Sequence, residues 1–497
     1  MVLAPYVMGI DLGTTTCRCA IFDLCGTEIA SAYREILVRY PRPLWAEVDP
    51  ETWWLSTVEV VREALDRSSI APDQIAGVGL SGLMHAPVLL DADGQPLVPA
   101  MLWMDQRCAP QCAAMSREQL ALGAIKMTER FSPTHTAPKL RWLADMQPEV
   151  LARVRELLLP KDFVRYRLTG AICTDVTDAG GTGLFDDERG EWDWEAVRLA
   201  HMPPDILPPV RPSWATGGHV TPQAARATGL APGTVVAVGG GDTSCTLTGV
   251  GALVTGEVCI YLGTAAWIAL VDGAAQAGRP SIGSFGATAT TGAALRWVRD
   301  LLAGAGGAGG SDSYNTLTQQ AGEVTAGAEG LFFLPHLMGE RGPQADPLAR
   351  GALIGLTLRH GRPQMVRAIL EGTAFHLRRL LEAQVSEHWS TIKPTAGVAC
   401  GGAARSPLWM QLLADITGMA VRVPAVVEAG VLGAAILGGV AAGILTRDTA
   451  SSQMAHAGPT YTPNPALAPR YNALYARYCQ VDDMLAPWFR ESGLDEE

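Results

Sequence analysis

Lysine is scarce in this chain. It occurs only four times among 497 residues, so arginine supplies 34 of the 38 basic side chains. Acidic residues outnumber basic ones, and the formal net charge is −12. A protein that binds the backbone of a nucleic acid normally carries a basic surface, so this balance argues against such a partner. It does not argue against a nucleotide, because backbone N–H groups and Mg²⁺ can hold phosphates.

Cysteine pairs with metal-binding spacing are also missing. The ten cysteines form no CxxC pair and no zinc-finger pattern with histidine, so we expect reduced, buried thiols. The N-terminus has no basic segment and enters a strand pattern directly, which indicates a cytoplasmic protein without a signal peptide. Residues 429–446 are uncharged but rich in Ala and Gly. We expect them to form a buried helix against a sheet and not a membrane span.

The best-known phosphate-binding motifs are absent as well. Lysine never follows glycine, so there is no P-loop. Residues 77–82 fit GxGxxG, but an extended run follows where a dinucleotide fingerprint needs a helix. These glycines instead predict a strand that closely approaches another backbone or a ligand.

Two segments half a chain length apart share one pattern. Residues 7–23 place apolar runs on both sides of a Gly13–Thr14 turn, and residues 258–270 do the same around Gly263–Thr264. Each pattern is typical of a β-hairpin. The repetition predicts a duplicated α/β architecture, although two short hairpins can also match by chance. Helical periodicity follows in the second half, over residues 362–384 and 407–418.

Three glycine-rich segments could hold a ligand. Asp11 precedes a turn with three threonines, which suits phosphate and hydrated Mg²⁺ but also suits an ordinary Asp/Thr turn. Asp242 follows three glycines at a strand end, where it either projects into a ligand site or caps a helix. Residues 401–406 fit a strand–loop–helix connection, in which Ser406 either contacts a flat ring or caps the helix.

Together and in this order, the motifs resemble the FGGY family of carbohydrate kinases, part of the actin-like ATPase superfamily. The resemblance extends over about residues 7–445 and is carried by residues 9–15, 81–85, 102–107, 162–170, 239–242, 333–341, 401–406 and 428–443. It implies an α/β fold with two ribonuclease-H-like domains flanking a deep catalytic cleft. Residues 1–248 would bind the sugar and supply the catalytic base and the first phosphate hairpin. Residues 249–497 would supply the second phosphate hairpin and bind adenosine.

The resemblance also implies roles for single residues, with ATP and Mg²⁺ as cofactors. Asp242 would be the general base for the sugar hydroxyl, and Asp11 would hold Mg²⁺ through water. The implied sugar-binding residues are Met84, His85, Trp103, Asp105, Asp242 and Thr243. The implied nucleotide-binding residues are Thr14, Thr15, Gly263, Thr264, Gly292, Gly402 and Ser406.

The substrate is the least determined part of this interpretation. Met84–His85 is similar to the branch of the family that converts D-xylulose to D-xylulose 5-phosphate, whereas glycerol kinases carry Arg-Glu there. Leu83 stands where that branch usually has Gln, and Thr243 where it has Asn. Residues 103–107 are also similar to gluconate kinases. We therefore expect D-xylulose, with gluconate, ribulose or another ketose or polyol as alternatives, and an ATPase that senses sugar without phosphorylating it as a minor one. We expect neither a nucleic-acid nor a membrane partner, and the sequence does not decide whether the chain forms a homodimer.

Overall fold

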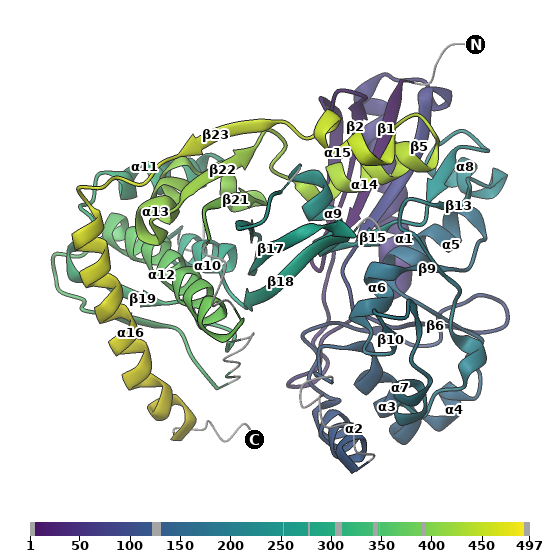
Figure 1. The fold of residues 1–497 in the computed structure, drawn as a ribbon, viewed down its shortest axis with the longest axis horizontal. Helices are drawn as coiled ribbons and strands as arrows, with labels where there is room; N and C mark the ends of the chain where they lie inside the picture. Colours follow the sequence, from purple (N-terminus) through teal and green to yellow (C-terminus); the bar gives the residue numbers. More distant parts are fainter. Residues whose placement is uncertain are drawn as a thin grey trace. The chain divides into compact units, whose positions relative to one another are not determined.

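The computed structural model describes residues 5–121, 131–251, 253–276, 279–303, 311–340, 346, 348–388 and 394–491. The chain forms two compact units (Figure 1). The first unit contains Met1–Gly251 and Ala429–Ala455, and the second contains Ala252–Glu428 and His456–Glu497. Within the described residues, no helix combines the length and the hydrophobicity that a membrane crossing requires.

The first unit is built on a sheet with strand order β13-β14-β5-β1-β2-β3. Its strands are β1 (Tyr6–Leu12), β2 (Thr16–Asp23), β3 (Glu28–Glu35), β5 (Ile75–Gly82), β13 (Thr216–His219), β14 (Val235–Ala237) and β15 (Gly240–Gly241). Strands β1, β2 and β3 form an antiparallel meander, while β5 runs parallel to β1, β14 and β15. The predicted hairpin over residues 7–23 is confirmed, and the Gly13 N–H closes its turn by donating to the Thr16 carbonyl oxygen.

The second unit repeats this topology. Its sheet has the order β18-β17-β16-β21-β22-β23. The strands are β16 (Glu257–Leu262), β17 (Ala266–Gln276), β18 (Arg279–Thr288), β21 (Ala396–Cys400), β22 (Ala420–Pro424) and β23 (Ala457–Tyr461). Again an antiparallel meander is followed by two parallel strands and an antiparallel edge strand. The duplicated architecture predicted from the two hairpins is confirmed.

Helices and short strands complete each unit. In the first unit these are β4 (Glu47–Val48), α1 (Pro50–Ser68), β6 (Val88–Leu90), β7 (Ala100–Met101), α2 (Ala109–Ala121), α3 (Thr136–Met146), α4 (Pro148–Leu151), β8 (Glu156–Leu158), α5 (Pro160–Thr169), β9 (Thr174–Asp175), α6 (Val176–Gly181), β10 (Phe185–Asp186), β11 (Glu191–Trp192), α7 (Trp194–Leu199), β12 (Val210–Arg211), α8 (Pro222–Thr228), α9 (Asp242–Gly249), α14 (Ala429–Ala441) and α15 (Arg447–Met454). In the second they are α10 (Gly292–Ala303), α11 (Ser311–Gly322), β19 (Phe332–Leu334), β20 (Ala352–Ile354), α12 (Arg362–His388), α13 (Pro407–Thr417) and α16 (Ala468–Glu491). Helices α12 and α13 confirm the periodicity over residues 362–384 and 407–418.

Helix α14 is the uncharged stretch near the end of the sequence, and it is buried as expected. Its backbone lies directly on the sheet of the first unit. A Cβ atom added to Gly9 would come within 1.9 Å of the Val431 carbonyl oxygen, and one added to Gly79 within 1.8 Å of the Ala434 carbonyl oxygen. The strands therefore carry glycine where the helix crosses them. This close approach to another backbone is what the glycines at residues 77–82 predicted.

The packing of α14 corrects the expected division into residues 1–248 and 249–497. The first unit ends at Gly251, close to the expected boundary, but it also includes residues 429–455. These residues belong there because α14 packs against β1, β5 and α9, and α15 packs against α14. The first unit is thus discontinuous in sequence, and the second unit is completed by β23 and α16.

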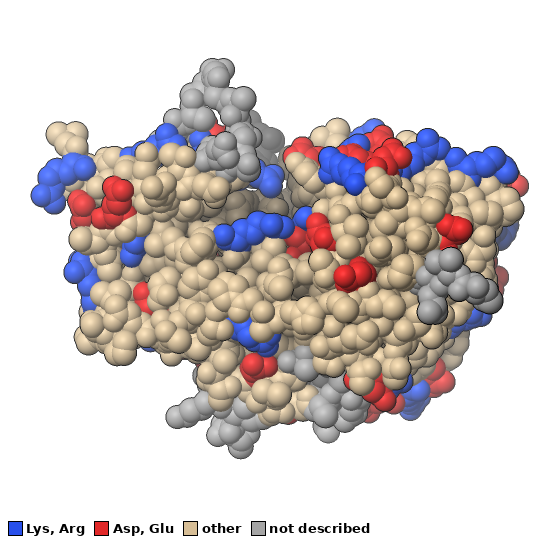
Figure 2. All heavy atoms as spheres, turned by 90° about the horizontal axis from the view of Figure 1, so that it is seen from above, with Lys and Arg blue, Asp and Glu red and all other residues tan. Residues whose placement is uncertain are grey.

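Charged side chains of both signs lie on the face drawn in Figure 2. On the face drawn in Figure 2, basic and acidic side chains are intermingled and separated by wide uncharged areas. The charge of −12 therefore does not form one continuous acidic field on that face.

Candidate active site

In the first unit, the candidate residues follow the carboxyl ends of parallel strands. Asp11 in β1 and Gly240 in β15 both pair with Ser81 of β5. Asp242 comes two residues after Gly240 and begins α9. Ligand sites of open α/β sheets lie at this edge. The sheet itself therefore brings Asp11 and Asp242 to the same edge of the unit.

Asp11 lies at the start of α14. A Cβ atom on Gly430, the second residue of that helix, would stand 3.2 Å from Asp11 Oδ2. The positive end of the helix dipole favours a negative carboxylate at this place. The oxygen donors offered here, a carboxylate and the threonine hydroxyls of the adjacent turn, are of the kind that Mg²⁺ prefers. Asp11 and its surroundings therefore fit the expected ion.

Met84 packs directly against the glycine that precedes Asp242. A Cβ atom on Gly241 would lie 2.9 Å from Met84 Sδ, and one on Gly181 would lie 2.5 Å from Met84 Cε. Neither glycine has room for a side chain while Met84 keeps its position. Met84, predicted to bind the sugar, and Asp242, predicted to act as base, are therefore brought together.

His85 is held in a strained conformation. Its φ is +74°, which is rare for a residue other than glycine and costs about 1 kcal/mol or more. Its Nδ1–H donates to the Gly181 carbonyl oxygen at 2.6 Å, so Nε2 carries the lone pair of the neutral ring. Its own carbonyl oxygen accepts from Thr136 Oγ1 at 3.1 Å and from Lys139 Nζ at 3.0 Å. These contacts fix the ring beside Met84.

The Asp242 carboxylate is half-buried and is oriented by its neighbour. Its Oδ1 accepts from the Thr243 N–H at 2.7 Å and from Thr243 Oγ1 at 3.3 Å. Thr243 was expected to contact the sugar, but in this structure its hydroxyl donates to Asp242. The residue that replaces the expected Asn thus orients the carboxylate of the predicted base.

A buried chain of hydrogen bonds supports the backbone before Asp242. The Gly241 N–H donates to Thr177 Oγ1 at 2.9 Å, and Thr177 Oγ1 donates to Asp175 Oδ2 at 2.6 Å. Asp175 in turn forms an ion pair with Lys161 at 3.0 Å. The motif at residues 162–170 indicated the family, but the sequence did not predict these hydrogen bonds and this ion pair.

Lys161 lies at the centre of a fully buried charge cluster. Its Nζ is 2.7 Å from Asp162, 3.0 Å from Asp175 and 3.0 Å from Asp178, while Arg165 also pairs with Asp162 at 2.7 Å. Burial raises the pKa of Asp178 to about 8. Burial alone would lower the pKa of Lys161, but the three carboxylates raise it overall. A neutral Asp178 balances two cations against two anions.

The scarcity of lysine was a signal for these supporting residues. Lys139 and Lys161, two of the four lysines in the chain, are both completely buried. A buried lysine needs partners that compensate its charge. Lys139 binds the backbone of His85, and Lys161 anchors the network behind Asp242.

Trp103 links the two predicted sites of the first unit, whereas Asp105 is held by its neighbours. Trp103 Nε1 donates to Thr14 Oγ1 at 2.8 Å, in the turn that also contains Thr15. Asp105 is completely buried; its Oδ2 accepts from the Ala46 N–H at 2.7 Å and from Arg107 at 2.6 Å. Its carboxylate is paired with Arg107 and fixes this segment, and its contact with a sugar stays a prediction.

The second unit gathers its candidate residues at the ends of β16 and β21, which are parallel neighbours. The Gly292 N–H donates to the Gly263 carbonyl oxygen at 2.9 Å, and the Ala293 N–H donates to the Thr264 carbonyl oxygen at 3.1 Å. A Cβ atom on Gly292 would come within 2.4 Å of Gly263 O. The second hairpin turn is therefore held against the start of α10.

Gly402 and Ser406 follow β21. A Cβ atom on Gly402 would meet no described atom within 4 Å, so the space above this backbone is open. Ser406 Oγ accepts from the Trp409 N–H at 3.3 Å and caps α13. Of the two interpretations of Ser406, the helix cap is observed, and a contact with the nucleotide stays a prediction.

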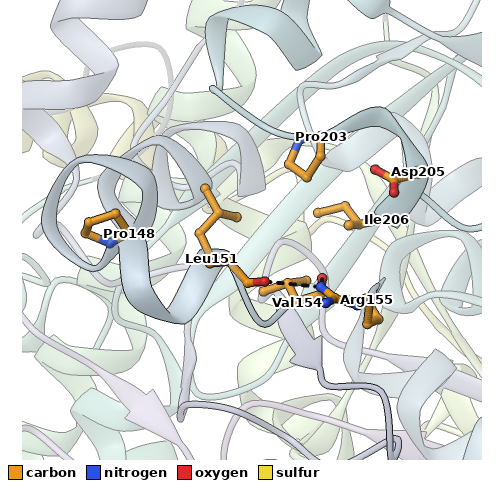
Figure 3. Close-up of a pocket in the computed structure, with 8 residues that line it drawn as sticks. Pro148, Leu151, Val154, Arg155, Pro203, Asp205 and Ile206 are labelled. Carbon is orange, nitrogen blue, oxygen red and sulfur yellow. Dashed lines mark hydrogen bonds between the residues drawn. The ribbon is translucent and has the colours of Figure 1, made fainter.

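A shallow cavity in the first unit is separate from these residues (Figure 3). Its volume is about 380 Å³, and it is lined by Pro148, Leu151, Ala152, Val154, Arg155, Pro203, Asp205 and Ile206. Arg155 donates to the carbonyl oxygens of Ala152 and Val154, which border the same cavity. None of the candidate residues lines this cavity, so the site is assigned from the strand ends.

Comparison with known proteins gives consistent results over the whole chain. Residues 6–249 match the N-terminal domain of the FGGY family of carbohydrate kinases, and residues 243–442 match the C-terminal domain. A xylulose kinase from Escherichia coli (strain K12) is 33% identical over 427 residues, covering 83% of this chain and 84% of its own. A glycerol kinase from Rhodospirillum rubrum is 32% identical, covering 96% and 98%. The structure of a gluconate kinase from Lactobacillus acidophilus is similar with a TM-score of 0.84 at 26% identity, covering 98% and 99%.

Proposed function

The chain belongs to the FGGY family of carbohydrate kinases, and from this premise we propose that it uses ATP to convert D-xylulose to D-xylulose 5-phosphate. One observation carries the proposal: Met84 packs against Gly241, the residue before Asp242, and both Met84 and the constrained His85 contact Gly181. An apolar side chain, an imidazole and a carboxylate close together are groups that suit a sugar. The similarity to the xylulose kinase supports the same acceptor.

Asp242 is the proposed general base. A carboxylate with an ordinary pKa near 4 is a weak base toward an alcohol. It therefore accepts the hydroxyl proton late, as the oxygen–phosphorus bond forms, and its first task is to orient the hydroxyl. The two bonds from Thr243 to Oδ1 support this task because they restrict rotation of the carboxylate.

Backbone and hydroxyl donors are proposed to bind ATP. In the first unit these are Thr14 and Thr15 of the hairpin turn, and in the second unit they are Gly263 and Thr264, with Gly292 behind them. The open backbone at Gly402 suits a flat ring, with Ser406 nearby in sequence. Asp11 is proposed to hold Mg²⁺, which supplies charge neutralisation at the phosphate oxygens when bound.

A cytoplasmic location is part of the proposal. All ten cysteines are free thiols, and eight of them are buried. Free thiols are typical of a reducing compartment.

Gluconate is the second candidate acceptor. The gluconate kinase structure is similar over nearly the whole chain, and residues 103–107 resemble those of gluconate kinases. The buried ion pair of Asp105 with Arg107 weakens this alternative, because neither side chain is left to recognise a carboxylate.

A panel of acceptors tests the proposal. D-Xylulose, D-ribulose, gluconate and glycerol would each be offered with MgATP, and both ADP and sugar phosphate would be quantified. We expect D-xylulose to have the highest kcat/KM with one sugar phosphate per ADP. A higher kcat/KM for gluconate or glycerol would overturn the acceptor but not the kinase reaction. ADP release without a sugar phosphate would favour the sugar-sensing ATPase.

A further inference from the structure

The second unit contains a buried polar cluster that has no part in the proposed transfer. His336 follows β19, Glu340 lies four residues later, and His376 is in α12. Their exposed fractions are 4%, 9% and 4%. None of these residues belongs to the sugar or nucleotide sites described above. Their side chains come from different parts of the sequence and converge on one point.

One carboxylate oxygen joins the two imidazoles. Glu340 Oε2 is 2.8 Å from His336 Nδ1 and 2.9 Å from His376 Nε2. The three donor atoms all lie within 4.8 Å of one another. The contact to His336 has the geometry of a hydrogen bond. Among the described residues, however, His376 finds no hydrogen-bond partner for either ring nitrogen, although the side chain is almost completely buried.

The geometry at His376 shows whether the cluster is a hydrogen-bonded network or a set of ligands for one metal ion. In a hydrogen-bonded network, the ring N–H would point at the oxygen that lies 2.9 Å away. Two ligands of one metal ion both point instead at the ion, and not at each other. Adjacent ligands of an octahedral ion, each about 2.1 Å from it, are about 3 Å apart. The 2.9 Å between His376 Nε2 and Glu340 Oε2 matches that spacing without hydrogen-bond geometry, whereas the 2.8 Å contact of His336 fits either explanation.

We propose that His336 Nδ1, Glu340 Oε2 and His376 Nε2 bind one divalent transition-metal ion. Two imidazoles and one carboxylate suit ions such as Mn²⁺, Fe²⁺ or Co²⁺, whereas Mg²⁺ and Ca²⁺ prefer oxygen ligands. The site is therefore distinct in chemistry from the Mg²⁺ site proposed at Asp11.

The surroundings of His336 are those of a metal ligand. Its Nε2 lies 3.0 Å from Asp482 Oδ1, a carboxylate that would orient the ring, and an ion at Nδ1 would displace the proton that Nδ1 now donates to Glu340. Asp482 in α16 is held by Arg379 of α12 at 3.2 Å. A metal ion would thus tie the segment after β19 to α12 and, through Asp482, to α16. Its role is to stabilise the second unit.

Cobalt binding tests the site. The full chain, prepared without a histidine tag and treated with a chelator, would be titrated with Co²⁺ while visible absorption is recorded. We expect one equivalent to bind with d–d bands and to raise the Tm. His376→Gln and Glu340→Gln should abolish the bands. The control His456→Gln, an exposed histidine of the same unit, should retain them.

Two further results decide between metal and hydrogen bonds alone. Asp482→Asn should weaken Co²⁺ binding by about ten- to a hundredfold while the bands persist. MgATP-dependent kinase activity serves as the check that each variant is folded. Failure of the wild-type chain to bind Co²⁺, or binding of equal strength by the His376 and Glu340 variants, would overturn the proposal. The wild-type result stands even if a variant does not fold.

Discussion

The two units have the same strand order but different chemistry at corresponding positions. When the hairpin turns are aligned 250 residues apart, both units keep glycine and threonine in the turn, but Tyr261 stands where the first unit has Asp11. Tyr261 stacks on Trp267 with ring centroids 5.5 Å apart. The duplicated hairpin is therefore a common scaffold, and the carboxylate is a feature of one copy alone.

The same contrast holds along each sheet edge. Asp11 lies near the end of β1 and Asp242 follows β15 in the first unit, whereas Gly263, Thr264 and Gly402 follow strand ends of the second. Carboxylates bind cations and accept protons, while glycine backbones and hydroxyls donate to anions. The two candidate carboxylates thus lie in the first unit, while the candidates of the second unit are glycines and residues with hydroxyls.

The strongest test of this division removes the base of the first unit. Asp242→Asn should lower kcat by about a hundredfold or more, because Asn accepts no proton from the hydroxyl. The KM for the sugar should change little, since the amide can still hydrogen-bond to the substrate. Steady-state kinetics would measure both, with the exposed Asp73→Asn as control. Near-normal turnover of the Asp242 variant would show that Asp242 is not the general base and that the first unit does not supply this catalytic group.

The second test removes the Asp11 side chain and, as a control, changes Tyr261, which stands at the corresponding position of the second unit. Asp11→Ala should lower kcat by about tenfold or more and raise the Mg²⁺ concentration needed for half-maximal activity. Its Tm should change little, because Asp11 would hold an ion and not the fold. Tyr261→Phe keeps the aromatic ring and serves as the matched control. If Asp11→Ala lowers the Tm but keeps its activity and Mg²⁺ dependence, Asp11 is a structural turn residue.

Local patterns predicted much of this contrast. The hairpin turns at Gly13 and Gly263 and the buried glycine-rich helix α14 depend on short-range sequence, because a turn or a close backbone contact demands glycine itself. The family resemblance indicated Met84 and Asp242, whose proximity the structure supports. These residues lie at strand ends, and strand ends can be recognised in a sequence.

Contacts between distant segments were not predicted. Nothing near Asp105 shows that the Ala46 N–H, 59 residues earlier, will donate to its carboxylate. Nor does the sequence around Lys161 reveal that Asp178 will become its third acidic neighbour. Segment 429–455 was assigned to the wrong unit for the same reason: its partners precede it by hundreds of residues.

A third prediction concerns the open backbone of the second unit. Gly402→Ala should raise the KM for ATP several-fold without changing the Tm, because the added methyl group meets only ligand. Gly292→Ala should differ, since its Cβ would come within 2.4 Å of a backbone oxygen and disturb the fold. Kinetics and thermal unfolding of both variants would test this. An unchanged KM for Gly402→Ala would place the nucleotide elsewhere.

The fourth prediction contrasts the buried charges of the two units. Lys161 and Arg165 face three carboxylates in the first unit, whereas a buried pair in the second, Arg367 with Glu371, is balanced. Because the pKa of Asp178 is raised to about 8, the folded chain holds a proton that the unfolded chain releases. Its contribution to stability is therefore complete below about pH 4 and is lost as the pH rises toward 8.

Asp178→Asn removes this dependence. Relative to the wild type, the Tm of the variant should rise by a few degrees between pH 5 and pH 8, because the amide needs no proton to remain neutral. Thermal unfolding across that range would measure the difference, with the exposed Asp66→Asn as control. A constant difference at all pH values would show that Asp178 is ionised throughout.

The smallest expected effect concerns selectivity within the first unit. Thr243 donates to Asp242 Oδ1 through a single hydroxyl, whereas an amide offers two donors and an acceptor. Thr243→Asn can keep the bond to Asp242 and add one to the sugar, so kcat/KM for D-xylulose should rise about two- to tenfold, the size of one net hydrogen bond. Other ketoses should gain less, because discrimination arises when a buried polar group is left unpaired.

Thr243→Val, which removes the hydroxyl at similar size, should lower kcat for every acceptor alike. If Asn changes all acceptors by the same factor, Thr243 only orients the base.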